Sequence, residues 1–229
     1  MRLFRFKKFQ NQLVATMILL IAVFSIVMSF IYFPDIYQSL WNEKKSKVKN
    51  LVQAQMAIVN HYYQLSKDGE MSEATAKVSA KKAIKDVRYG EKERNYFYII
   101  DKKLEMIMHP YQPQLEGQDI SDLQDANGNY LIREMVEVAE SKGAGFVNYH
   151  WQYYDNKNRI EPKMSYVQEF SPWGWIVGTG VYINDVQENM ASLFLKICLY
   201  GIGIVVLMGI FIYFLSRKIV RPIYRMEKQ

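Results

Sequence analysis

The sequence of 229 residues contains one cysteine, Cys198, and lacks the short motifs of the common enzyme families. With a single cysteine, no disulfide can form within the chain and no cysteine-based metal site is available. There is no nucleophile elbow, phosphate loop, Cys-x-x-Cys or His-Glu-x-x-His, and no constellation of carboxylates that suggests acid–base chemistry. His61 and His150 have no partner at metal-ligand spacing, and we interpret both as structural. We therefore expect neither an enzyme nor a metal or other cofactor.

Charged residues are also missing from two long apolar runs near the ends of the chain, at residues 13–33 and 197–215. About 20 apolar residues in a helix cross the hydrocarbon core of a bilayer. The basic start before the first run would suit a cleaved signal peptide, but the run is longer than a signal peptide needs. It also ends in the bulky residues Phe30–Phe33 instead of a small-residue cleavage site. We predict transmembrane helices at residues 13–33 and 193–215.

The net charge of +6 is unevenly placed. Residues 34–190 hold 19 Lys and Arg against 22 Asp and Glu, whereas the rest of the chain holds ten against one. Nearly all of the excess flanks the two apolar runs, before the first and after the second, and short basic flanks remain in the cytoplasm. We therefore expect a cytoplasmic segment 1–12, an extracytoplasmic domain 34–190 and a second cytoplasmic segment 216–229. This distribution does not support nucleic-acid binding.

The segment between the two runs predicts an α+β domain. Apolar residues at helical spacing predict a stalk that continues the first span to a break at Lys67–Glu70, then a second helix from the N-cap Ser72 to Gly90. Another helix is expected between Asn127-Gly128 and Gly143. Alternating, aromatic or β-branched residues predict five antiparallel strands, at residues 95–100, 104–108, 145–153, 162–170 and 175–182. The expected domain is a long helical hairpin followed by an antiparallel sheet of about five strands.

An ordered series of motifs between Arg88 and Tyr182 resembles the single-Cache (type 2) domain of bacterial chemoreceptors and sensor histidine kinases. The series comprises Tyr96-Phe97-Tyr98-Ile99, Met106–Pro110, Gly117 with Asp119, Asn127-Gly128, Gly145–Trp151, Lys163 with Ser165-Tyr166-Val167, and Trp173–Tyr182. Residues 216–223 resemble the opening of a HAMP relay helix, a module that is truncated in this chain. The resemblance implies a PAS-like sheet with a ligand cavity, a homodimer in the bacterial inner membrane, and a cytoplasmic signalling module as downstream partner.

The candidate ligand-binding residues lie on the predicted strands, and they are Tyr96, Tyr98, His109, Tyr149, Trp151, Lys163, Ser165 and Tyr166. Because side chains alternate between faces, Tyr96 pairs with Tyr98, Tyr149 with Trp151, and Lys163 with Ser165. No Asp or Glu lies in these motifs, so a cation such as Lys163 favours a small anion, most plausibly a short carboxylate.

Each candidate also has a plain structural interpretation. The aromatic residues would suit a core, Lys163 a solvated strand, and His109 a strand end. Arg88 can reach the cavity or favour the C-terminus of its helix. Trp173 and Trp175 are expected to be packing residues.

We interpret the chain as the sensing portion of a transmembrane chemoreceptor. Ligand binding is expected to shift the last strand and, through Tyr182 and Ile183, the second span. One alternative is the sensor region of a two-component histidine kinase. Another is a non-sensing periplasmic module that dimerises or binds a partner.

Overall fold

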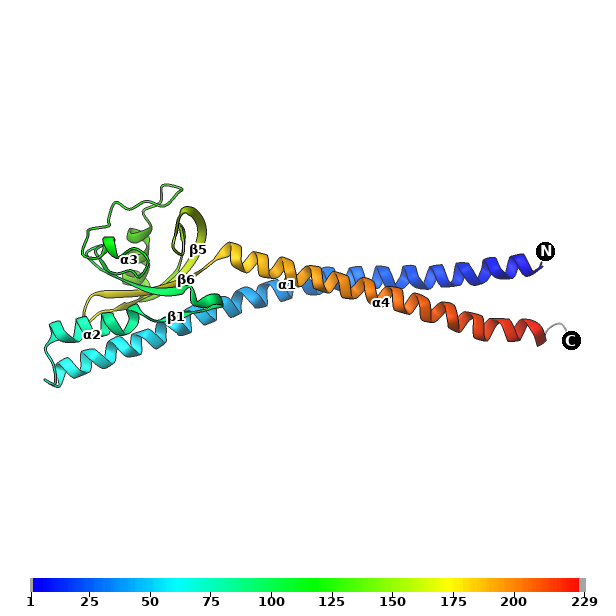
Figure 1. Ribbon diagram of the computed structural model, residues 1–229, viewed down its shortest axis with the longest axis horizontal. Helices are drawn as coiled ribbons and strands as arrows, with labels where there is room; N and C mark the ends of the chain where they lie inside the picture. Colours follow the sequence, from blue (N-terminus) through cyan, green and yellow to red (C-terminus); the bar gives the residue numbers. More distant parts are fainter. Residues whose placement is uncertain (1, 227–229) are drawn as a thin grey trace. The chain divides into compact units, whose positions relative to one another are not determined.

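The computed structural model describes residues 2–226, whose helices and strands are drawn in Figure 1. The helices are α1 (Arg2–Lys67), α2 (Glu73–Lys85), α3 (Leu131–Lys142) and α4 (Ile183–Met226), with short 3₁₀ turns at Glu91–Glu93 and Pro113–Leu115. The strands are β1 (Arg88–Tyr89), β2 (Asn95–Asp101), β3 (Met106–Met108), β4 (Ala144–Tyr153), β5 (Asn156–Phe170) and β6 (Trp175–Tyr182). The predicted α+β class is confirmed.

The chain forms two compact units. The helical unit comprises the residues up to Ser39 and those from Glu188 onward, and the sheet unit comprises Leu40–Gln187. Two helices therefore belong to both units, because α1 leads into the sheet unit and α4 leads out of it.

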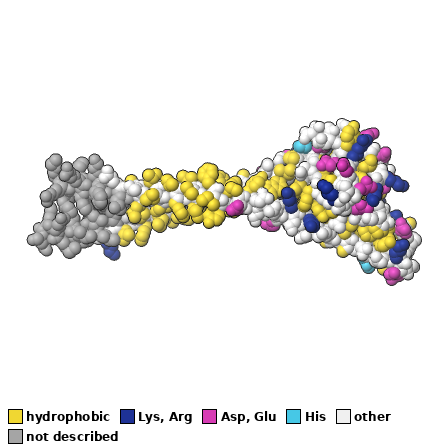
Figure 2. Space-filling view, turned by 180° about the vertical axis from the view of Figure 1, so that it is seen from behind, with side chains coloured by type: hydrophobic (Ala, Val, Ile, Leu, Met, Phe, Trp, Pro, Cys, Tyr) yellow, Lys and Arg dark blue, Asp and Glu magenta, His cyan; other side chains and the backbone are white. Residues whose placement is uncertain are grey.

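The helical unit presents apolar side chains on its outer surface. Leu20, Phe24 and Leu207 expose 63%, 64% and 67% of their surface, and Figure 2 shows hydrophobic side chains over most of the described part of this unit on the face in view. Within this unit the two helices touch where the rings of Phe33 and Phe194 lie 4.7 Å apart. By length and composition both helices qualify to cross a membrane. The span boundaries remain predictions, and residues 227–229 of the expected relay segment lie outside the described residues.

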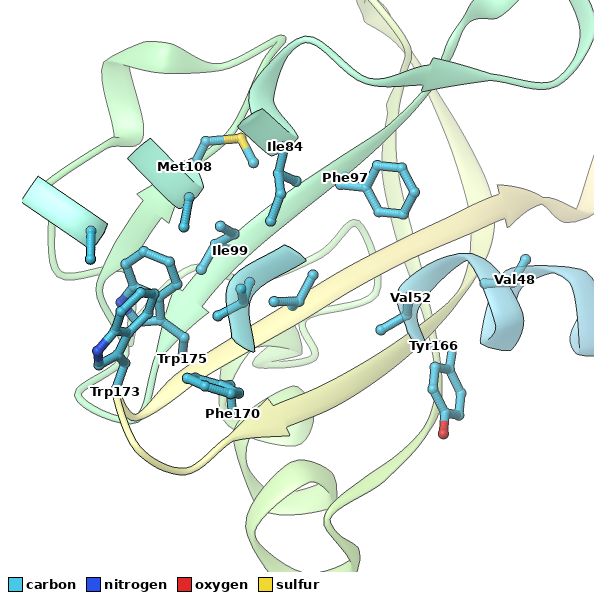
Figure 3. Packing of buried hydrophobic residues seen from close by; sticks show 14 residues of the cluster. Val48, Val52, Ile84, Phe97, Ile99, Met108, Tyr166, Phe170, Trp173 and Trp175 are labelled. Atoms are coloured by element: carbon cyan, nitrogen blue, oxygen red, sulfur yellow. The ribbon is translucent and has the colours of Figure 1, made fainter. Parts of the chain in front are cut away.

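The sheet unit is built on an antiparallel sheet with strand order β1-β2-β6-β5-β4, and β3 pairs with β2. The outer part of α1 and all of α2 cover one face, and α3 covers the other (Figure 1). Figure 3 shows the first of these layers, in which Val48 and Val52 of α1 and Ile84 of α2 meet the sheet. Each face therefore has its own buried core, and the sheet separates the two.

Local chemistry explains most element boundaries. Ser72 caps α2 as expected, since its side chain accepts a hydrogen bond from the Thr75 amide. Gly143, in the left-handed region at φ 74°, ends α3. Pro34 lies inside α1 without ending it.

Three expected boundaries are wrong. The helix α2 ends at Lys85 instead of Gly90, because Arg88 and Tyr89 pair with β2 as a short strand. The strand β3 begins at Met106, two residues later than expected, after Leu104 adopts a left-handed conformation. The strand β5 begins at Asn156, ahead of Pro162, which fits within the strand because β6 pairs with β5 only from Lys163 onward.

Candidate functional site

The sheet face that α3 covers carries a cluster of polar and aromatic side chains around Lys163. This residue pairs with Tyr182 of β6 on one side and with Tyr149 of β4 on the other. Directly paired residues of antiparallel strands point to the same face, so the three side chains meet there. Seven of the eight predicted residues come together on this face, and we name them the Lys163 cluster: Tyr96, Tyr98, His109, Tyr149, Trp151, Lys163 and Ser165.

The Lys163 side chain is almost fully buried, with 1% of its surface exposed. Its Nζ donates a hydrogen bond to the Tyr96 hydroxyl at 2.9 Å. The same nitrogen lies 4.1 Å from the centroid of the Tyr96 ring and 5.1 Å from that of Tyr182. No carboxylate among the described residues forms an ion pair with it. Burial therefore lowers the pKa of Lys163 from 10.5 to about 7.

Hydroxyl groups line the floor of the cluster. The Tyr149 hydroxyl and Ser165 Oγ lie 2.8 Å apart in a buried hydrogen bond, and the Tyr98 hydroxyl donates to Met135 Sδ at 3.5 Å. Burial raises the pKa of Tyr98 to about 12 and raises those of Tyr96 and Tyr149 as well. These groups are therefore neutral hydroxyls at physiological pH, able to donate to an anion.

His109 contributes a neutral ring at the edge of the cluster. Its ring centroid lies 4.9 Å from that of Tyr96 and 5.8 Å from that of Trp151. Its Nδ1 accepts a hydrogen bond from the Gln112 amide at 3.0 Å, which assigns the ring proton to Nε2. Burial, and then the nearby charge of Lys163, lower the pKa of His109 to about 3. The ring is thus a hydrogen-bond donor without charge.

Taken together, these residues form a desolvated cationic group with neutral donors beside it and no negative group opposite. Such a constellation suits an anion. An anion would supply the negative counter-charge for Lys163, and the neutral donors would hydrogen-bond to the remaining lone pairs of the anion. An ammonium ligand would meet only repulsion from Lys163.

Residues 40–195 of the chain match the family described as Single Cache domain 2. The chain belongs to this family. The match includes every strand of the sheet and therefore the whole Lys163 cluster.

Two curated relatives are similar to this chain. The methyl-accepting chemotaxis protein McpP of Pseudomonas putida strain KT2440 is 36% identical over 210 residues, which are 90% of this chain and 38% of McpP. The sensor histidine kinase MctS of Rhizobium johnstonii is 32% identical over 155 residues, which are 68% of this chain and 32% of MctS. The chain thus spans about a third of the length of these relatives.

A solved Cache structure, described as the structural basis for carboxylic acid recognition by a Cache chemosensory domain, is 43% identical. It matches 64% of this chain and 97% of its own, with a TM-score of 0.61. At this identity and TM-score the likeness supports the Cache fold directly.

One predicted ligand residue does not lie with the Lys163 cluster. Tyr166 lies on the opposite face of the sheet, in the core beside α1, as Figure 3 shows. The physical reason is strand alternation, because Ser165 points into the Lys163 cluster and its neighbour must point away. Tyr166 faces Phe146 instead, with ring centroids 4.9 Å apart. The prediction for Tyr166 is therefore corrected.

The structure also decides the roles of Arg88 and the two tryptophans near the last turn. The Arg88 guanidinium donates to the carbonyls of Lys85 and Val87 at the end of α2, and it also lies 5.6 Å from the ring centroid of Tyr111, which packs against Tyr96. Trp173 and Trp175 pack in the core on the α1 side, as expected.

Two glycines of β6 lie against side chains of the Lys163 cluster but were not among the predicted residues. A Cβ added at Gly178 would lie 2.5 Å from Tyr98 Cζ, and one added at Gly180 would clash with Ser165 Oγ. The side chains of Tyr98 and Ser165 therefore fit in place because the neighbouring positions of β6 are glycines and carry no side chain. The Gly-x-Gly spacing within a strand was the available signal. Tyr182 was not among the predicted site residues either, because its position at the end of the strand suggested only a connection to the second span.

Proposed function

We propose that this chain is the sensing portion of a bacterial transmembrane receptor and that it binds a short carboxylate at the Lys163 cluster. The observation that carries the proposal is the buried ammonium group of Lys163, which has no ion-pair partner among the described residues. A buried, unpaired cation is costly unless a ligand supplies the counter-charge. The domain would thus act by binding, with no catalytic step.

The surroundings of Lys163 favour a small ligand. Tyr96 and Tyr182 hold the ammonium group between their rings, and the hydroxyls of Tyr149 and Ser165 lie on the same face. A carboxylate accepts from several donors at once, whereas the aromatic walls suit a short apolar remainder. The 43% identical Cache domain that recognises carboxylic acids supports this ligand class.

A ligand panel tests the proposal on the chain embedded in lipid nanodiscs. We expect at least one of acetate, propionate and pyruvate to bind in calorimetry and to raise the melting temperature, because a ligand of the folded state stabilises it. Acetamide, propionamide and ethylamine are the matched controls, since they keep the size and lack the negative charge. Tight binding of an amide or amine, or no response to any carboxylate, would contradict the proposal. The absence of any response to carboxylates would favour the alternative of a periplasmic module that dimerises or binds a partner without sensing.

We further propose that the chain resides in the inner membrane as a homodimer, with residues 34–190 in the periplasm. The basic residues that flank both apolar runs support this orientation, and both helices are long and apolar enough to span a bilayer. An alkaline phosphatase fusion near residue 120 is expected to be active, and a fusion at residue 8 inactive. The topology, and the sensor interpretation with it, would be overturned if the phosphatase fusion near residue 120 were inactive and a reporter that works only in the cytosol were active at the same position.

The output that fits best is chemotaxis, through a cytoplasmic signalling module beyond the second span. McpP supports this assignment, because its similarity extends over 90% of the chain. The second candidate is a histidine kinase, supported by MctS. Both would share the same input site. Assays of the full-length gene product distinguish them, since a chemoreceptor biases swimming towards or away from the ligand and a kinase changes its autophosphorylation.

A further inference from the structure

The junction between β6 and α4 contains a second side-chain cluster that the ligand site does not explain. Asp185 lies in the first turn of α4. Its Oδ1 accepts a hydrogen bond from the Tyr153 hydroxyl at 3.0 Å, and its Oδ2 accepts one from the Tyr154 hydroxyl at 3.1 Å. We name Tyr153, Tyr154 and Asp185 the junction clasp. It ties the end of the β4–β5 hairpin to the helix that leaves the sheet unit.

One side chain connects the Lys163 cluster to this clasp through β6. Tyr182 is the residue paired with Lys163, and its ring faces the ammonium group. Its hydroxyl donates to the Gln152 carbonyl and accepts from the Tyr154 amide at 3.0 Å. The rings of Tyr154 and Tyr182 are 4.8 Å apart. A displacement of Tyr182 therefore acts on Tyr154 directly.

A second connection runs through β2. Tyr96 accepts the hydrogen bond of Lys163, and Oδ1 of the preceding residue, Asn95, lies 3.2 Å from the Tyr154 hydroxyl, whose single hydrogen it shares with Asp185 Oδ2. Tyr182 thus contacts Tyr154 directly, and Tyr96 is connected to Tyr154 through the adjacent residue Asn95. The two connections converge on Tyr154.

The backbone at Tyr154 is held in an unusual conformation. Its φ is 53°, in the left-handed region that residues other than glycine seldom adopt, and the β4–β5 register shifts at Gln152/Tyr153. The amide and hydroxyl hydrogen bonds of Tyr154 hold it there. A residue other than glycine persists in this region only where the surrounding contacts hold it, so the conformation of Tyr154 depends on these bonds.

We propose that the junction clasp transmits the occupancy of the Lys163 cluster to the first turn of α4. This inference rests on the proposed carboxylate site. A carboxylate bound to Lys163 competes with the Tyr96 hydroxyl for the ammonium group. It moves the ammonium group relative to the rings of Tyr96 and Tyr182. The hydrogen bonds of Tyr154 then shift, and Asp185 carries the change into α4, whose helix continues into the second apolar run.

The test separates binding from transmission in the 229-residue chain in nanodiscs. Asp185→Asn keeps the shape of the side chain, removes its charge and replaces one acceptor oxygen by a donor, so the two tyrosine hydroxyls can no longer each donate to an oxygen of their own. Tyr153→Phe with Tyr154→Phe is the second variant, because it keeps both rings and removes the two donors. Asp155→Asn, at an exposed position beside the clasp, is the matched control.

Two quantities are measured for each variant, with the tightest binder among acetate, propionate and pyruvate. Calorimetry gives the Kd, and hydrogen exchange gives the opening of amides in residues 183–195. In the wild type and in Asp155→Asn we expect the ligand to change this exchange by about threefold or more. In Asp185→Asn and the double variant we expect a Kd within about threefold of wild type and no ligand-induced change.

Three outcomes would overturn the clasp. A wild-type ligand response in both clasp variants would show that other contacts transmit the signal. Ligand binding to the wild type without any change in residues 183–195 would leave the carboxylate site standing and remove its connection to α4. Loss of binding in both variants would place the clasp in the ligand site itself. If no carboxylate binds the wild type, the proposed function fails and the clasp fails with it.

Discussion

Replacing Lys163 with methionine is expected to abolish carboxylate binding and, at the same time, to make the sheet unit more stable. The binding loss follows from the loss of the only cation in the Lys163 cluster. Truncating one partner of a buried charge pair costs about 2–5 kcal/mol, so we expect the Kd to rise by roughly 30-fold or more. Calorimetry with acetate, propionate and pyruvate measures this change.

The gain in stability has the same physical origin. Folding moves the Lys163 ammonium group from water to a site with 1% exposure and no ion-pair partner among the described residues. Methionine has a similar length and no charge, so it fills the site without that desolvation cost. We expect the free energy of unfolding to rise by about 2–4 kcal/mol near pH 7. Tryptophan fluorescence during urea unfolding reports on this unit, because all four tryptophans lie in it, at positions 41, 151, 173 and 175.

The control is Lys157→Met, an exposed lysine on the same strand, β5. It is expected to change the free energy of unfolding by no more than about 0.5 kcal/mol and to leave the Kd unaltered. If Lys163→Met binds carboxylates as tightly as the wild type, the anion site lies elsewhere. If it instead unfolds the domain, Lys163 has a structural partner and the unpaired-cation argument is wrong.

Carboxylate affinity is expected to fall steeply above neutral pH in the wild type. Burial lowers the pKa of Lys163 to about 7, so above this pH the ligand-free protein holds a neutral amine. Binding of an anion then requires uptake of one proton, and the Kd should rise about tenfold for each pH unit above 7. Below pH 7 the ammonium group is already charged and the Kd should be nearly constant. No neighbour obscures this range, because the pKa of His109 is about 3 and that of Tyr98 about 12.

Proton uptake can be measured directly. Calorimetry at pH 8.5 in two buffers of different ionisation enthalpy should show close to one proton bound per carboxylate, and almost none at pH 5.5. An exposed lysine as the anion site would give no uptake at either pH and a flat Kd up to about pH 9, since its pKa stays near 10.4.

The stability of the ligand-free protein gives an independent check with the opposite sign. Between about pH 7 and pH 10 the unfolded chain binds a proton at Lys163 that the folded protein does not, so the free energy of unfolding should rise with pH. The buried tyrosines oppose this rise from about pH 10, because their folded pKa values are raised and the unfolded chain ionises first. In Lys163→Met the rise should vanish.

Much of the site could be predicted from the pattern of residues, and the failures have identifiable causes. Alternation placed Lys163, Ser165, Tyr149 and Trp151 on one face, because a strand has a period of two and both strands are regular there. The same rule should have excluded Tyr166 from the predicted ligand residues. It was included because it follows Ser165 in the family motif. The boundary errors at Gly90 and Pro162 arose where pairing with the adjacent strand in the sequence overrode the turn and proline signals, since Arg88 and Tyr89 pair with β2 and the residues before Pro162 pair with β4.

The sequence by itself determined the two apolar helices, the asymmetry of their basic flanks and the alternating strands between them, because each of these follows from the order of neighbouring residues. Only the tertiary structure decided that Lys163 is buried against Tyr96 and Tyr182 without a carboxylate partner among the described residues. It also decided that Asp185 joins two tyrosines about 30 positions earlier in the chain. Burial and charge pairing depend on which distant strands become neighbours, and that choice is made by the packing of the whole sheet against its helices.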